Sequence, residues 1–153
     1  MFSTLEWRIQ MEAPTNWQPT EQTSYPNVLL WMERRDPRGV MLLAAERVSG
    51  QKLDSLAYAK KTITKLEEIG FTTRSPQLHT TTGATLVDFE NDTAFLRQAY
   101  LVINGTGFTL TLSADSSRSR GLHLRAFDSA LRSIKPIRAP GSDASDDNDE
   151  PQQ

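Results

Sequence analysis

The stretch QAYLVINGTGFTLTLSADSSRSRGLHLRAFDSALRSI, residues 98–134, decides the fold that this sequence predicts. Asn104-Gly105 lies between two runs of alternating apolar residues, and both residues tolerate the positive φ angles of a two-residue hairpin turn. The stretch therefore predicts two antiparallel strands, over residues 95–103 and 107–113, followed by a helix that Pro136 ends.

The hairpin turn also sets the register of the two strands. The predicted cross-strand pairs are Ile103–Thr106, Leu101–Phe108 and Ala99–Leu110. One face then collects only apolar side chains, those of Ala99, Leu101, Ile103, Phe108, Leu110 and Leu112. The other face carries Tyr100, Val102, Thr109 and Thr111. A slip of one residue would mix the two sets, so the pattern itself favours this register.

The chain before this hairpin predicts further strands and one helix. Alternation predicts a half-buried strand over residues 7–11, and the run 28–32, apolar on both faces, predicts a central strand that pairs with 40–47. Beyond residue 70, the patterns predict an edge strand over 71–78, interrupted by Pro76, and an alternating strand over 85–90.

Two helices complete the prediction. The first spans residues 53–69 and ends at Gly70, and the second follows a cap at Asp115 or Ser116. The apolar stripe of the first comprises Leu53, Leu56, Ala59, Ile63, Leu66 and Ile69. The stripe of the second comprises Leu124, Phe127, Leu131 and Ile134. Because hairpins dominate and both sheet faces need cover, the sequence predicts an α+β fold with an antiparallel β-sheet flanked by helices.

Length and charge predict one folded domain and a tail. We expect a single α+β domain over residues 1–138 and a disordered acidic tail over residues 139–153. The tail holds five acidic residues and no base, and without it the chain carries a net charge of +3 rather than −2. The simplest interpretation is a solvated terminus. One alternative is that the tail folds back on the basic last helix. The other is that the tail prevents other polyanions from binding to this helix.

Several classes of protein are disfavoured by composition. The chain has no cysteine, which excludes disulfides, a thiol nucleophile and thiolate metal sites. It begins with no basic segment followed by an apolar run, and no apolar stretch approaches the roughly 20 residues that span a bilayer. We therefore expect a cytoplasmic protein without a membrane span.

The sequence offers little catalytic chemistry. Its two histidines, His79 and His123, are interpreted as surface residues. A triad of Ser116, His123 and Asp128 can be drawn on paper, but no nucleophile elbow accompanies it. Neither a metal-ligand spacing nor a phosphate-binding loop occurs, so no cofactor and no metal are expected. The sequence therefore predicts a non-catalytic protein, and the alternative is an enzyme of unknown type that uses His79 or His123.

The order of elements resembles the PsbP/Mog-like superfamily over residues 7–136. The resemblance rests on the Pro-x-x-Trp segment at 14–17, the hairpin 28–47, the helix ending at Gly70, and the final TLTLSA and FDSALRSIKP segments. It implies an α/β/α sandwich and a role in binding other proteins. One group in this superfamily, the Eag-type chaperones of type VI secretion, is cytoplasmic and holds apolar helices of secreted effectors. The resemblance to the superfamily implies no particular site residues.

A protein partner is therefore the expected ligand, and the same interpretation allows a homodimer. Trp17 is expected to plug the edge of the core, which we favour over a ligand stack. The candidate protein-binding residues are Trp17, Tyr25, Arg118, Arg125 and Arg132, and the edge strand near 72–78 is a further candidate surface. Nucleic acid is not expected, because no aromatic residue alternates with the arginines of the last helix.

Overall fold

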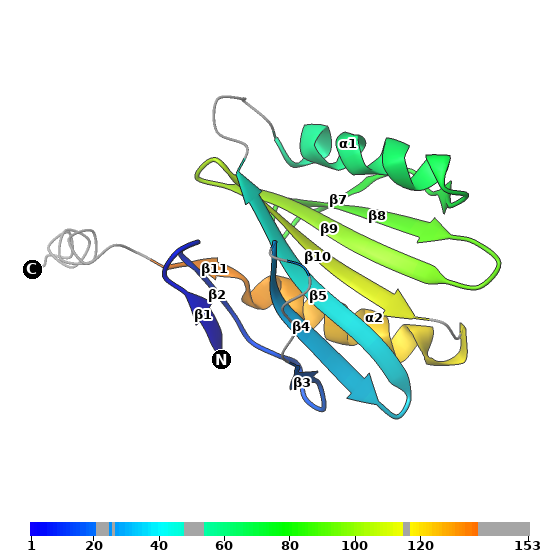
Figure 1. The fold of residues 1–153 in the computed structure, drawn as a ribbon, viewed down its shortest axis with the longest axis horizontal. Coiled ribbons are helices and arrows are strands. Elements are labelled where there is room, and N and C mark those ends of the chain that lie inside the picture. Colours follow the sequence, from blue (N-terminus) through cyan, green and yellow to red (C-terminus); the bar gives the residue numbers. More distant parts are fainter. Residues whose placement is uncertain (21–24, 26, 48–53, 115–116, 138–153) are drawn as a thin grey trace, which may run out of the picture.

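A computed structural model describes residues 1–20, 25, 27–47, 54–114 and 117–137, with the side chains of 117–119 left undescribed. The predicted tail, 139–153, and the domain boundary at residue 138 lie outside these residues. The described chain forms the strands β1 (Phe2–Thr4), β2 (Ile9–Met11), β3 (Gln18–Pro19), β4 (Val28–Arg35), β5 (Arg38–Arg47), β6 (Thr72–Thr73), β7 (Gln77–His79), β8 (Ala84–Glu90), β9 (Phe95–Ile103), β10 (Thr106–Ala114) and β11 (Lys135–Pro136), and the helices α1 (Ser55–Glu68) and α2 (Ser117–Ser133) (Figure 1).

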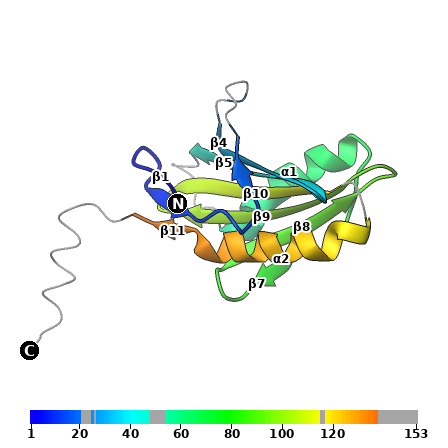
Figure 2. The same ribbon diagram turned by 90° about the horizontal axis from the view of Figure 1, so that it is seen from below.

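The strands form two antiparallel sheets. The main sheet has eight strands in the order β3-β4-β5-β10-β9-β8-β6, and β7 also pairs with β8. The small sheet has the order β1-β2-β11. Helix α2 lies along one face of the main sheet, and α1 lies on the other (Figures 1 and 2). The predicted α+β fold, an antiparallel sheet flanked by helices, is confirmed.

The hairpin of β9 and β10 has the predicted register. Its cross-strand pairs are Ile103–Thr106, Leu101–Phe108 and Ala99–Leu110. Asn104 and Gly105 have φ angles of 51° and 78°, as the turn requires. Strand β10 pairs with β9 on one side and β5 on the other, so it is the central strand.

The prediction that the run 28–32 forms a central strand covered on both faces is wrong. These residues belong to β4, whose outer neighbour is the two-residue strand β3. Leu30 and Met32 are buried, whereas Trp31 is only half-buried on the opposite face. A run of apolar residues cannot by itself distinguish full cover from a strand that leaves one face partly open.

Helix α2 and the small sheet cover the larger core. Phe127 and Leu131 are buried as predicted, and the helix also buries Ala130 and His123, which the predicted stripe omits. Among the strands, the buried side chains of this core include Ile9, Met11, Met32, Met41, Leu43, Ala99, Phe108, Leu110 and Leu112. The apolar face predicted for the hairpin therefore faces α2.

Helix α1 covers a smaller core on the other face. Asp54 caps its first turn by accepting a hydrogen bond from the amide of Ala57 at 2.8 Å, and Gly70, with φ 103°, follows its end. Tyr58 and Ala59 are the buried residues of the helix, whereas the predicted stripe residues Leu56 and Ile69 are exposed and Leu53 lies outside the described residues.

Helix α1 therefore turns a different side toward the sheet than the sequence predicts, and the contacts of Tyr58 explain why. Tyr58 reaches across Gly107, and its hydroxyl lies 3.0 Å from Thr109 Oγ1 and donates to Glu46 Oε1 at 3.2 Å. Its ring packs edge-on against Tyr100. Burial raises the pKa of the Tyr58 phenol to about 12, against the hydrogen bond from Thr109, and the charge of Glu46 adds to the rise.

The N-terminal region also differs from its prediction. Strand β2 begins at Ile9, and Trp7 lies in the turn that joins it to β1, a strand the sequence did not predict. Arg8 has a φ angle of 57°, which interrupts the alternation that predicted a strand from residue 7. The indole of Trp7 instead stacks under the guanidinium of Arg47, 4.6 Å from the ring centroid.

Candidate functional site

Half of one sheet face has no helix of the described chain over it. Helix α1 packs mainly on β8 and β9, so the neighbouring strands β10, β5 and β4 remain open on this face (Figures 1 and 2). We call this surface the open half-sheet. It consists of the half-buried side chains of Val28, Trp31, Glu33, Val40, Leu42, Ala44, Thr109, Thr111 and Ser113, of which Glu33 is the charged member.

The centre of the open half-sheet is apolar. Leu42 lies opposite Trp31 on β4 and opposite Thr111 on β10. The Trp31 indole donates its only N–H to Glu33 Oε2 at 3.0 Å, which leaves its ring as an apolar surface beside Leu42. The arrangement is a shelf of one aromatic and several aliphatic side chains with hydroxyl groups on one side. Such contiguous apolar surface is typical of a site for another protein.

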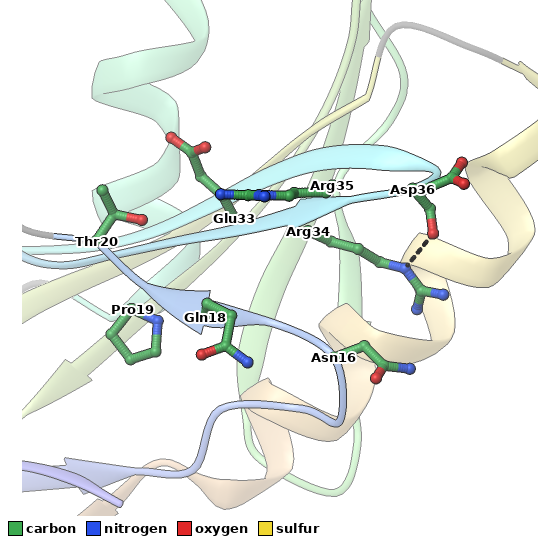
Figure 3. A pocket seen from close by; sticks show the side chains of 8 residues that line it. All are labelled: Asn16, Gln18, Pro19, Thr20, Glu33, Arg34, Arg35 and Asp36. Carbon is green, nitrogen blue, oxygen red and sulfur yellow. Dashed lines mark hydrogen bonds between the residues drawn. The ribbon is translucent and has the colours of Figure 1, made fainter.

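A second surface lies beside β3 at the edge of the sheet. This surface is a groove of about 730 Å³. Figure 3 shows side chains that line it, among them Glu33, Arg34 and Arg35 of β4 and Asn16 and Gln18. Arg34 and Arg35 extend from opposite sides of β4, and Arg34 Nε donates to the Asp36 carbonyl at 3.4 Å. Because the two guanidinium groups do not converge, this groove offers no concentrated charge to an anion.

A polar network joins the β7–β8 turn to α2. His79 Nε2 donates to Asp128 Oδ1 at 2.8 Å, and His79 Nδ1 lies 2.8 Å from the hydroxyl of Thr82. Arg132 donates from Nε to Asp128 Oδ2 at 2.6 Å and from a terminal nitrogen to Thr81 Oγ1 at 3.2 Å. The His79 side chain is 9% exposed and that of Asp128 is 44% exposed. The prediction that His79 is a surface histidine is therefore wrong.

The network does not resemble a working acid–base pair. Both ring nitrogens of His79 already have protein partners, so neither is left to take a proton from a bound substrate. His123 is fully buried, its Nε2 donates to the Arg38 carbonyl at 2.9 Å, and its ring packs edge-on against Trp17. His123, too, is not a surface residue. The triad of Ser116, His123 and Asp128 considered from the sequence does not form, because Asp128 binds His79. Ser116 lies outside the described residues.

The network makes one pH dependence predictable. Partial burial acts to raise the pKa of Asp128, but the hydrogen bonds from Arg132 and His79 hold it below its ordinary value. A lowered carboxyl pKa stabilises the fold above the unfolded pKa of about 3.9, and this contribution is lost as pH falls through the folded pKa. We expect Asp128→Asn to lower the free energy of unfolding at pH 7. The difference from the unaltered chain should become smaller toward pH 3. Urea unfolding across this pH range measures it.

The control for this measurement is Asp92→Asn at an exposed turn position. Its effect should stay small at every pH. An Asp128→Asn effect that is constant from pH 7 to pH 3 would contradict the assigned cause. Since Asp128 is nearly half exposed, solvent screening keeps the expected effect modest.

The structure places the predicted binding residues in different regions. Trp17 is 3% exposed, which confirms that it plugs the core edge and means that it is not a surface for a partner in this conformation. Tyr25 is 59% exposed, Arg125 is exposed on α2, and Arg132 belongs to the polar network. The side chain of Arg118 lies outside the described residues. A binding role for Tyr25, Arg118, Arg125 and Arg132 stays a prediction.

The residues of the open half-sheet were not among the binding residues predicted from the sequence. The signal for this surface was present, because Trp31 and Leu42 alternate with buried residues on paired strands. The missing information was how much of the sheet α1 covers.

Within the described part of the chain, no group of three or more His, Asp or Glu residues could hold a metal ion, and no helix is long and apolar enough to cross a membrane.

Comparisons with known proteins identify the fold. No family model and no curated protein sequence matches the chain. The solution structure of cyanobacterial PsbP (CyanoP) from Synechocystis sp. PCC 6803 aligns with a TM-score of 0.61 at 12% identity, over 89% of this chain and 91% of that one. LpqN, described as involved in cell envelope biogenesis of Mycobacterium tuberculosis, aligns with a TM-score of 0.61 at 17% identity, over 85% of this chain and 83% of that one. The chain therefore has a PsbP-like α+β fold.

Proposed function

We propose that this chain is a non-catalytic protein-binding module that holds an apolar helix of another protein on the open half-sheet. The observation that carries the proposal is the shelf formed by Trp31, Leu42 and their neighbours, which lies beside α1 and is not covered by a helix of the described residues. Helices bind such apolar surfaces through one face, so an apolar or amphipathic helix is the partner that this surface suits best.

The open half-sheet has the width of one helix. Strands β10, β5 and β4 are neighbours at about 4.8 Å spacing, which gives a strip about 14 Å wide. A helix with its side chains is about 10–12 Å across. A partner helix would therefore lie next to α1 in the same layer, and it would bury the half-exposed ring of Trp31.

The narrower form of the proposal is a cytoplasmic chaperone or adaptor similar to the Eag-type group. It is supported by the PsbP-like fold, by the lack of cysteine, which suits a reducing compartment, and by the apolar character of the open half-sheet. The occupied ring nitrogens of His79 and the buried position of His123 favour binding over catalysis. The alternative is that a second copy of this chain binds the same surface and forms a homodimer.

Paired variants test this proposal. Leu42→Asp places a charge at the centre of the open half-sheet, whereas Leu56→Asp places the same charge on an exposed apolar position of α1. We expect a synthetic helix of ~20 mainly apolar residues to bind the unaltered chain and Leu56→Asp alike. Leu42→Asp should weaken this binding at least about tenfold, because a buried unpaired charge is costly. The measurement is the blue shift of tryptophan emission, assigned to Trp31 with Trp31→Phe.

Capture experiments extend the test to a natural partner. A protein captured from the source organism supports the proposal only if an apolar helical segment mediates capture and Leu42→Asp abolishes it while Leu56→Asp does not. Equal binding by both variants, with circular dichroism showing that each is folded, would overturn the assignment to the open half-sheet. A dimer in light scattering that Leu42→Asp dissociates would replace the partner helix by a second copy of the chain.

A further inference from the structure

A pocket of about 540 Å³ lies at one end of the main sheet, away from the centre of the open half-sheet. Its lining comes from the start of α1, the β7–β8 turn, the end of β9, the end of α2, and β11. Leu101, Ile103, Leu131 and Ile134 form an apolar floor, and Leu101 and Leu131 belong to the buried core. The volume is within the range of about 300–1,000 Å³ that small-molecule sites occupy.

One wall of the pocket carries a fixed positive group. Arg132 lines the pocket, and its guanidinium is held by Asp128 at 2.6 Å and by Thr81 at 3.2 Å. These contacts use two of the five N–H donors of the guanidinium. Asp128 is itself held by His79, so the network orients Arg132 before any ligand arrives. An oriented guanidinium with donors left is suited to a carboxylate.

The opposite charge comes from the start of α1. Asp54 lines the same pocket, and its Oδ1 accepts the capping hydrogen bond from the Ala57 amide. Within the described part of the chain, no hydrogen bond occupies its second carboxylate oxygen, which can accept one from a ligand. Ser55 beside it is tied to β8 by contacts of its hydroxyl with the Gly83 carbonyl at 3.1 Å and with Thr85 Oγ1 at 2.7 Å. The acidic group is therefore anchored to the sheet.

We propose that this pocket binds a free α-amino acid with an apolar side chain, such as leucine. The ammonium group would bind Asp54, the carboxylate would bind Arg132, and the side chain would lie on the floor formed by Leu101 and Leu131. A zwitterion with an apolar body would satisfy both charges and the floor at once. The acidic segment 139–153 cannot fill this role, because it contains no leucine, isoleucine, valine or aromatic residue.

The test compares L-leucine with ligands that each lack one feature, by isothermal titration calorimetry on the full chain. The probes are 4-methylpentanoate without the ammonium group, 3-methylbutylamine without the carboxylate, glycine without the side chain, and N-acetyl-leucinamide without either charge. We expect L-leucine to bind at least about tenfold more tightly than each of them, since a hydrogen bond to a charged group contributes about that factor or more and burial of the side chain that glycine lacks contributes a similar factor.

Two variants assign the charges. Asp54→Asn keeps a side chain that caps helices as well as Asp does, and it should weaken L-leucine at least about tenfold while leaving 4-methylpentanoate unchanged. Arg132→Gln should weaken L-leucine by a similar factor and leave 3-methylbutylamine unchanged. A merely structural role for either residue would weaken all probes equally and overturn the proposal. No binding of L-leucine, or equal binding of N-acetyl-leucinamide, would also overturn it, the latter by indicating a peptide side chain.

Discussion

Phe108→Ala should lower the free energy of unfolding by about 3–5 kcal/mol, the cost of removing a large aromatic side chain from a packed core. Phe108 is fully buried near the start of β10, and its cross-strand neighbours are Leu101 and Ala45. Because β10 is the central strand, few neighbours can move to fill the cavity. Urea unfolding followed by circular dichroism measures the loss.

The control for this variant is Leu5→Ala, at a position that is exposed in the turn between β1 and β2. Its effect should stay within about 0.5 kcal/mol, as for surface substitutions generally. A loss below about 1 kcal/mol for Phe108→Ala would show that the core is not centred on β10.

Gly107→Ala should destabilise the fold by about 1–3 kcal/mol through overpacking. A Cβ atom at position 107 would lie 2.6 Å from Tyr58 Cζ and 2.9 Å from Cε1, closer than side-chain atoms can approach. The ring cannot easily move, because its hydroxyl binds Glu46 and Thr109 and the ring makes a T-shaped contact with Tyr100.

A double-mutant cycle tests this cause. In a Tyr58→Ala background the clash disappears, so the cost of Gly107→Ala should fall toward zero and give a coupling energy of about 1 kcal/mol or more. The matched control is Gly121→Ala in α2, where no atom lies within 4 Å and where alanine favours helix, so this change should be neutral or stabilising. Equal costs of Gly107→Ala with and without Tyr58 would contradict the proposed clash.

The parts of the fold that could be predicted are those encoded locally. The turn at Asn104-Gly105 and the alternation around it specify the β9–β10 register, because a slip by one residue would expose the apolar face. Gly70 after α1 and Pro76 between β6 and β7 act within a few residues of the breaks they cause. Such features are visible in a single sequence.

The parts that were missed depend on contacts between distant residues. The orientation of α1 is decided by Tyr58 above Gly107, which are 49 residues apart in the sequence. The partner of His79 is Asp128, again 49 residues away, so the histidine appeared isolated in its threonine-rich turn. In the same way, the apolar run of β4 revealed burial but not the coverage of each face.

The candidate sites also differ in whether they depend on local sequence or on contacts between distant residues. The sequence showed that Trp31 and Leu42 belong to a hairpin, and the protein-binding role expected from the resemblance suits their surface. The pocket between Asp54 and Arg132 could not be foreseen, because five segments of the chain meet there.

Both margins of the main sheet end in strands of only two or three residues, β3 on one side and β6 and β7 on the other. Pro19 within β3 has no amide hydrogen, and Pro76 separates β6 from β7. Among the described residues, β6 and β7 together pair with most of the outer edge of β8, whereas β3 pairs only with Met32 and Glu33 of the eight-residue β4. The β8 margin therefore offers another chain little free backbone to extend, and edge-to-edge pairing between copies would have to begin at the β4 margin.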